Sequence, residues 1–133
     1  MLKLEIVTPE RRVLDETVDS VTVPTASGEA GILPNHAPLI SALKPGVLSY
    51  SAKGTTERMA VAGGFVEVSS NTVSVMTDAA EKASEINVER ARLERETAER
   101  ELAAQSTAPI ESTESIREKI EESNAKLQLA SGK

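Results

Sequence analysis

The stretch that decides the fold is GEAGILPNHAPL, which runs from Gly28 to Leu39. Two glycines, two prolines and the only histidine of the chain fall within these twelve residues. Glycine permits positive φ angles and close backbone approach, and proline fixes φ and removes a backbone donor. Leu33 and Ala37 each precede a proline, which pushes them toward extended geometry. We therefore predict a shaped loop over residues 28–39, between two strands.

Residues 2–77 show the two-residue period of β-strands. At the start of the chain, three apolar residues alternate with three others: Leu2, Leu4 and Ile6 with Lys3, Glu5 and Val7. Turn signals recur about every ten residues, at Thr8-Pro9, Ala26-Ser27-Gly28, Lys44-Pro45-Gly46, Lys53-Gly54 and Ser69-Ser70-Asn71. Short strands separated in this way predict an antiparallel sandwich or barrel. The pair Gly63-Gly64 inside a strand pattern indicates a bulge or a close backbone crossing.

After Asp78 the sequence changes to good helix formers. Glutamate, arginine and alanine predominate from Glu85 onward, and they predict a helix over residues 85–105. Serine, threonine and Pro109 then interrupt the pattern. A second helix is predicted beyond them, because one face at helical spacing carries Ile116, Ile120, Ser123, Leu127 and Ala130. Ser115 and Glu118 have the spacing of a capping box at its start.

The two patterns divide the chain into a β domain over residues 1–84 and a two-helix hairpin over residues 85–133. Each helix offers only four or five side chains for burial, at best about 2 kcal/mol each. Isolated helices of this length are marginal in water. We therefore expect a weakly held hairpin that can pack on the β domain, open, or dock on a partner.

Composition narrows the classes of function. The 133 residues carry a net charge of −6, and no basic patch of the kind that binds nucleic acid stands out. There is no cysteine, and no apolar run approaches the ~20 residues that span a bilayer. The N-terminal MLKLEIVTPE is interpreted as a first strand and not as a signal peptide. We expect a soluble chain that meets a membrane only through partners.

Residues that carry chemistry are scarce. With one histidine and no cysteine, a two-histidine or thiolate metal site is not available. The glycines of Gly28-Glu-Ala-Gly31 are followed by Ile32 and not by the lysine of a phosphate-binding loop. Most carboxylates fall on the solvated faces of predicted helices. We therefore expect no enzymatic activity in this chain and no cofactor or metal.

Four motifs in order resemble one known family. GEAGILPNHAPL is followed by LKPGVL (43–48), AGGFVEV (62–68) and VSVMTDAAE (73–81), and the set is similar to the epsilon subunit of the F-type ATP synthase. The resemblance implies a flattened sandwich of about ten strands followed by an α-helical hairpin. It implies a non-catalytic central-stalk subunit of the rotor, which couples proton flow to ATP synthesis and inhibits ATP hydrolysis through its helices.

The resemblance also implies partners and contact residues. The implied partners are the gamma subunit and the c-subunit ring, and also the alpha and beta subunits when the helices extend. Contacts with gamma and the ring are expected from Glu29, Gly31, Pro34, His36 and Pro38. Glu29 is otherwise a solvated turn carboxylate, and His36 a loop histidine bonded to a nearby carbonyl. The expected location is the cytoplasmic face of a bacterial plasma membrane, or the stromal face of a thylakoid.

Some family members bind ATP through the motif Ile/Leu-Asp-x-x-Arg-Ala at the start of the first helix. The matching residues here are Ile86, Asn87, Arg90 and Ala91, with asparagine in place of aspartate. Asparagine can cap a helix but brings no charge. The alternative interpretation is that Asn87 and Arg90 only start and solvate the helix. We expect ATP to bind weakly or not at all.

Inhibitory family members place basic residues on the last helix. This chain offers Arg117, Lys119 and Lys126, but acidic residues outnumber them there. We therefore expect weak or conditional inhibition. The alternative to the rotor function as a whole is a free-standing β-sandwich module that binds protein and carries a helical tail.

Overall fold

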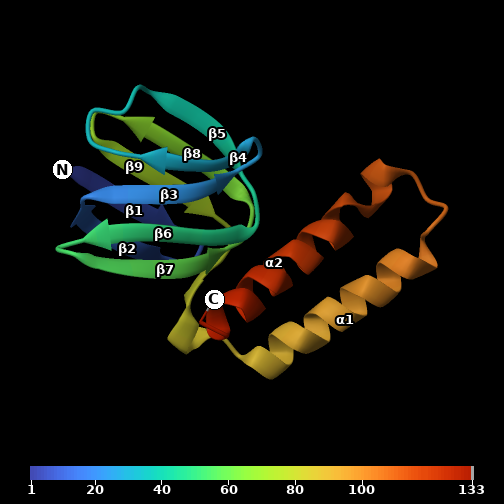
Figure 1. The fold of residues 1–133 in the computed structure, drawn as a ribbon. Coiled ribbons are helices and arrows are strands. Elements are labelled where there is room, and N and C mark those ends of the chain that lie inside the picture. Colours follow the sequence, from blue (N-terminus) through green and yellow to red (C-terminus); the bar gives the residue numbers. More distant parts are fainter. Residues whose placement is uncertain (133) are drawn as a thin grey trace.

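The computed structural model describes residues 1–132 and consists of a β-sandwich with a helical hairpin at one end (Figure 1). The strands are β1 (Leu2–Val7), β2 (Arg12–Val18), β3 (Ser20–Thr25), β4 (Gly28–Ile32), β5 (Leu39–Leu43), β6 (Gly46–Ala52), β7 (Thr55–Val61), β8 (Gly64–Ser69), β9 (Thr72–Thr77) and β10 (Ala80–Lys82). This confirms the predicted ten-stranded sandwich followed by two helices.

The strands form one sheet in the order β10-β7-β6-β3-β5-β8-β9-β1-β2, and β4 pairs with β3 outside this path. The sheet is mixed, because β1 and β9 run parallel. The prediction of a wholly antiparallel sheet is wrong at this pair. Parallel neighbours need a long connection, and here the connection is most of the sandwich itself. A two-residue period does not encode the direction of a neighbouring strand.

The core lies inside the folded sheet and is aliphatic. Leu2, Leu4 and Ile6 are fully buried, as their alternation predicts. Further buried residues from β2 to β9 join them in one cluster, including Val18, Val23, Ile32, Leu48, Met59, Val66 and Val75. Burial of each such side chain contributes about 1.5–3 kcal/mol, so the sandwich is the stable part of the molecule.

Two of the predicted turns are tight hairpins with positive φ at both central residues. Lys53 and Gly54 join β6 to β7 with φ angles of 52° and 80°, and Ser70 and Asn71 join β8 to β9 with 50° and 59°. Positive φ at both central residues suits the twist of a tight hairpin. Gly64 is needed for another reason, because a Cβ there would collide with the Met76 carbonyl. The predicted close crossing at the double glycine is confirmed.

The predicted loop over residues 28–39 is wrong in its first part. Gly28–Ile32 forms strand β4, paired with β3 from Val21↔Ile32 to Thr25↔Gly28. Glycine weakens a strand but does not prevent one, and β4 has only this one partner. The loop proper is residues 33–38, where the two prolines lie.

The hairpin contains α1 (Val88–Ala104) and α2 (Glu114–Ala130), with short 3₁₀ turns η1 (Ala83–Glu85) and η2 (Ile110–Thr113) before them. The predicted domain boundary between residues 84 and 85 falls inside η1. α1 begins later than predicted because Asn87 caps it, its Oδ1 accepting the Arg90 N–H at 3.0 Å. The predicted Ser115 cap is wrong: Ser115 lies inside the first turn of α2.

Helix α2 lies between α1 and strands β6 and β7 (Figure 1). Its buried residues are Ile116, Ser123, Ala125 and Leu129. The predicted stripe included the first and second of these, Ile116 and Ser123, but not Ala125 and Leu129. A helix that packs on two neighbours buries two faces, and a single stripe describes only one of them.

Candidate functional site

The residues predicted to contact gamma and the c-ring lie toward opposite ends of β4. Glu29 lies next to the β3–β4 turn, near the helical hairpin, since Ala26 of that turn and Arg117 of α2 line one groove. The loop with Pro34, His36 and Pro38 follows the other end of β4. A strand rises about 3.3 Å per residue, so the two sets are separated by the length of the strand. Gly31 lies between them, exposed, with open space around it.

The loop of residues 33–38 is held by the neighbouring β8–β9 turn. The backbone N–H of Asn35 donates to Asn71 Oδ1 at 2.7 Å. His36 Nδ1 lies 2.6 Å from the Ala37 carbonyl oxygen, as in the loop-histidine interpretation. Leu33 is exposed in the same loop. This end of the sandwich therefore offers a fixed, partly apolar surface, and a partner contact there stays a prediction.

A second surface, which the sequence reasoning missed, lies on the outside of β5, β8 and β9. Register pairs Ala42 with Phe65 and Phe65 with Met76, so the three side chains share one face. Ile40 lies on the same face of β5. The exposed fractions are 73% for Ile40, 58% for Phe65 and 48% for Met76. We call these four residues the outer apolar face.

The alternation in AGGFVEV could have revealed the outer apolar face. Val66 and Val68 are buried, so Phe65 must point outward. Phe65 is the only phenylalanine of the chain, and it lies outside the core. Large apolar side chains that gather on a surface mark an interaction site.

The residues that match the nucleotide motif surround a small pocket at the base of the hairpin. Asn87, Arg90 and Ala91 line it, but Ile86 instead packs with Ala60, Ala125 and Leu129. The pocket holds about 240 Å³, and its other lining residues are Glu81, Glu85, Glu94 and Lys126.

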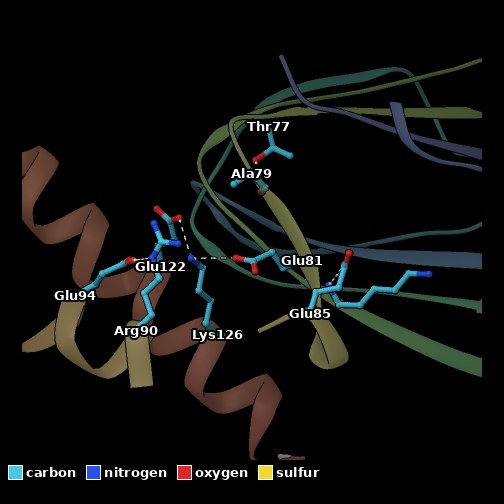
Figure 2. Close-up of polar contacts among 9 residues, drawn as sticks. Thr77, Ala79, Glu81, Glu85, Arg90, Glu94, Glu122 and Lys126 are labelled. Carbon is cyan, nitrogen blue, oxygen red and sulfur yellow. Dashed lines mark hydrogen bonds and ion pairs between the residues drawn. The ribbon is translucent and has the colours of Figure 1, made fainter. Parts of the chain in front are cut away.

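The charges of this pocket do not suit a polyphosphate. Three carboxylates line it against two cations. Both cations are already paired: Arg90 Nε lies 3.0 Å from Glu94 Oε1, and Lys126 Nζ lies 3.1 Å from Glu81 Oε1 (Figure 2). An added anion would have to displace these carboxylates. Weak or absent ATP binding stays a prediction, now with a structural reason beside Asn87.

The basic residues of α2 differ in how free they are. Arg117 Nη2 donates to the Ile110 carbonyl at 2.7 Å. Lys119 is exposed. Lys126 is only 17% exposed and contacts Glu81 and Glu122. Burial by itself would lower the pKa of the Lys126 ammonium, but Glu81, Glu122 and Glu94 raise it above its usual value. In this closed arrangement, only Lys119 is presented freely to a partner.

Comparison with known proteins identifies the sandwich. Residues 1–83 match the family model described as the ATP synthase Delta/Epsilon chain, beta-sandwich domain. The chain belongs to this family. The resemblance drawn from the four motifs is thereby confirmed, and the epsilon chain is a subunit of ATP synthase.

Relatives of the epsilon family extend the match into the helices. The ATP synthase epsilon chain of Carboxydothermus hydrogenoformans is 53% identical over 102 residues, which are 77% of this chain and 76% of that one. The ATP synthase epsilon chain of Nitratidesulfovibrio vulgaris strain DP4 is 44% identical over 128 residues, 96% of this chain and 87% of its own.

A solved structure of the same fold is found within an assembled complex. A chain in the cryo-EM structure of the Euglena gracilis mitochondrial ATP synthase, OSCP/F1/c-ring in rotational state 1, superposes with a TM-score of 0.74 at 26% identity. The match covers 99% of this chain and 81% of that chain. Among residues 1–132, no helix combines the length and apolar character needed to cross a membrane.

Proposed function

We propose that this epsilon-family chain is a non-catalytic rotor subunit in the central stalk of an F-type ATP synthase, coupling proton flow to ATP synthesis. The observation that carries this proposal is the outer apolar face. Ile40, Phe65 and Met76 are exposed together on three neighbouring strands. A rotor subunit must bind its stalk tightly, and apolar side chains at the centre of a contact supply most of such binding energy.

The gamma subunit is the proposed partner of the outer apolar face. Leu33, in the loop of residues 33–38, is also exposed, and this loop leads directly into β5, which carries Ile40 of the outer apolar face. Pro34, His36 and Pro38 are proposed as contacts there. Glu29, at the other end of β4, is proposed as a separate polar contact, with the loops of the c-ring.

The hairpin is the proposed regulatory part. When it leaves the sandwich, α2 becomes available to the alpha and beta subunits, with Arg117, Lys119 and Lys126 as the candidate contacts. Because α2 carries more carboxylates than cations, the proposed inhibition of ATP hydrolysis is weak or conditional. The chain meets the membrane only through the complex, on the cytoplasmic face in a bacterium or the stromal face of a thylakoid.

The experiment that tests the stalk function is binding of the gamma subunit from a relative such as Carboxydothermus hydrogenoformans. The full chain is compared with Phe65→Glu and Ile40→Glu. Each variant places a charge within the outer apolar face, and desolvating an unpaired charge is unfavourable by several kcal/mol. We expect affinity for gamma to fall more than about tenfold while the sandwich stays folded.

The matched control is Leu93→Glu on α1. Leu93 is 58% exposed, like Phe65, but it lies on the hairpin. Unchanged binding by this control and loss by the two variants support the proposal. If the full chain itself does not bind gamma, the free-standing binding module becomes the better explanation.

A further inference from the structure

The contact between α2 and the sandwich has a small apolar component. Ala125 and Leu129 of α2 pack on Ala60 of β7, with Val47 and Ile86 at the edge. Alanine buries little area, so Leu129 supplies most of the apolar gain at this contact. Regions with few buried contacts open at low free energy. Other interactions must therefore contribute to keeping the hairpin closed.

Lys126 joins the hairpin to the sandwich through charge. Its Nζ lies 3.1 Å from Glu81 Oε1 on β10 and 3.7 Å from Glu122 Oε1 on α2 (Figure 2). The side chains of all three residues are at least two-thirds covered. An ion pair that is partly withdrawn from solvent is screened less than an exposed pair. Two other ion pairs reach the sandwich: Lys44 pairs with Glu121 of α2, and Arg11 pairs with Glu85 of η1. Each is 4.0 Å long and more exposed than the Lys126 pair.

The surroundings of Lys126 are strongly acidic. The carboxylates that act on Glu122 are Glu94 of α1, Glu81 of β10 and Asp78, which precedes β10. Arg90 is the other cation nearby, and Glu94 holds it. Closing the hairpin brings these negative charges together, and like charges that approach repel. Lys126 is the cation placed between the carboxylates of the two parts.

We propose that Lys126 is an electrostatic clasp: through its ion pair with Glu81 of β10, it holds the helical hairpin closed on the sandwich without any bound nucleotide. Lys126 and Glu81 line the pocket where the resemblance places ATP. A carboxylate of the chain itself therefore takes the place of an anionic ligand in closing the hairpin. This inference goes beyond the rotor function, because it concerns the equilibrium of the chain by itself.

Lys126 and its two neighbouring carboxylates, Glu81 and Glu122, have different roles in closure. Lys126→Gln removes the cation and leaves the carboxylates unneutralised, so it opens the hairpin most. Glu81→Gln removes the carboxylate on the sandwich that pairs with Lys126, and it also opens the hairpin. Glu122→Gln removes a carboxylate on the same helix as Lys126, and with it a repulsive charge, so the hairpin stays closed.

The experiment measures the distance between spin labels in the full chain. The natural sequence has no cysteine, so Thr56→Cys on β7 and Gln128→Cys on α2 give unique attachment points. Thr56 and Leu129 line the same groove, so the labels lie close together when the hairpin is closed. Far-ultraviolet circular dichroism and thermal unfolding of every variant verify that the sandwich is intact.

We expect one short distance in the parent chain and a longer one when α2 leaves. The ratio of open to closed populations rises about tenfold in Lys126→Gln, the change expected for loss of one charged hydrogen bond. It rises in Glu81→Gln and does not rise in Glu122→Gln.

The matched controls are Lys119→Gln and Glu118→Gln, which neutralise exposed charges on the same helix. Distances unchanged from the parent in both controls complete the expected pattern. Parent-like distances in Lys126→Gln and Glu81→Gln overturn the proposal, and so does equal opening in the controls. Because Glu81 lies on the sandwich, a folding defect confined to α2 in Lys126→Gln does not affect the second variant.

Discussion

Phe65 lies opposite Met76 in the antiparallel register of β8 and β9, and both side chains point away from the core. One residue along, Val66 pairs with Val75, and both are fully buried. The inner face of these two strands is thus aliphatic, and their outer face carries one large apolar pair, Phe65 with Met76, next to the polar pair Glu67 with Ser74. The Phe65–Met76 pair contributes nothing to the core, and it fits the partner contact proposed for the outer apolar face.

The first prediction compares two neighbouring residues of β8. Val66→Ala lowers the free energy of unfolding by about 1.5–3 kcal/mol, because it empties part of the core. Phe65→Ala changes it by less than about 1 kcal/mol, since the ring is mostly exposed in the free chain. Urea denaturation of the isolated chain measures both. A large loss of stability in Phe65→Ala would mean that the ring packs within the chain and not on a partner.

The second prediction concerns the double glycine. Gly64→Ala forces a Cβ against the Met76 carbonyl, so β8 and β9 must separate. Overpacking of this kind lowers the free energy of unfolding by about 1–3 kcal/mol. Gly31→Ala is the control, because open space surrounds Gly31. Thermal denaturation should show a clear fall for the first variant and little change for the second.

Much of this fold follows from local sequence patterns. The alternation of Leu2, Leu4 and Ile6 with other residues determines which face of β1 is buried, and turn residues such as Lys53-Gly54 determine where strands end. These features depend only on neighbouring residues. The parallel pairing of β1 with β9 does not, because it is set by the path of the whole chain.

The candidate sites were predicted less well for the same reason. Glycine and proline marked residues 28–39 as one loop, yet the pairing with β3 makes a strand of the first five residues and places Glu29 far from His36. The partners of Lys126 come from β10 and from its own helix. No local spacing relates residue 81 to residue 126, so the clasp became visible only in three dimensions.

The third prediction concerns the nucleotide pocket. ATP titrated into the isolated chain should give no micromolar binding by calorimetry, because the two cations of the pocket are paired with carboxylates. Asn87→Ala should weaken α1 by about 1 kcal/mol through loss of its cap, with or without ATP. Micromolar affinity in the parent chain that disappears in Arg90→Ala would contradict this account and restore the nucleotide site.

The fourth prediction is a pH dependence of hairpin closure. Burial, more than any neighbouring charge, raises the pKa of the Glu122 carboxyl in the closed form. The closed form therefore binds a proton at a higher pH than the open form does. Closure becomes more favourable as the pH falls from neutral through the raised pKa, toward the ordinary glutamate value of about 4.3.

The test of this dependence uses the labelled chain between about pH 7.5 and about pH 5, a range set by the ordinary glutamate pKa. The open population should decrease on acidification in the parent and stay constant in Glu122→Gln. The charged groups around Glu122 are Lys126, Glu94, Glu81 and Asp78. Arg90 and Glu101 of α1 and Lys119 of α2 also line the groove between the helices. An identical pH response in Glu122→Gln would assign the effect to one of these groups instead.

The last prediction concerns inhibition of ATP hydrolysis. Deleting residues 109–133 removes α2 and its basic residues Arg117, Lys119 and Lys126. In the closed form Lys126 is engaged by Glu81 and Glu122, and α2 carries more carboxylates than cations. Of the three basic residues, only Lys119 is free in the closed form, and one exposed charge pair with a partner contributes at most about 1 kcal/mol. The ATPase rate of the reconstituted F1 should therefore rise less than about fivefold on deletion.

The proposed clasp also predicts how single substitutions change the inhibition of ATP hydrolysis. In the full-length chain, Lys126→Gln opens the hairpin but also removes a cation that a partner could bind, whereas Glu81→Gln opens it and leaves the three cations free. Stronger inhibition of ATPase by Glu81→Gln than by the parent would show that the clasp withholds α2 from the alpha and beta subunits. A many-fold rise on deletion from the parent complex would instead mean that the hairpin already inhibits strongly, despite its acidic last helix.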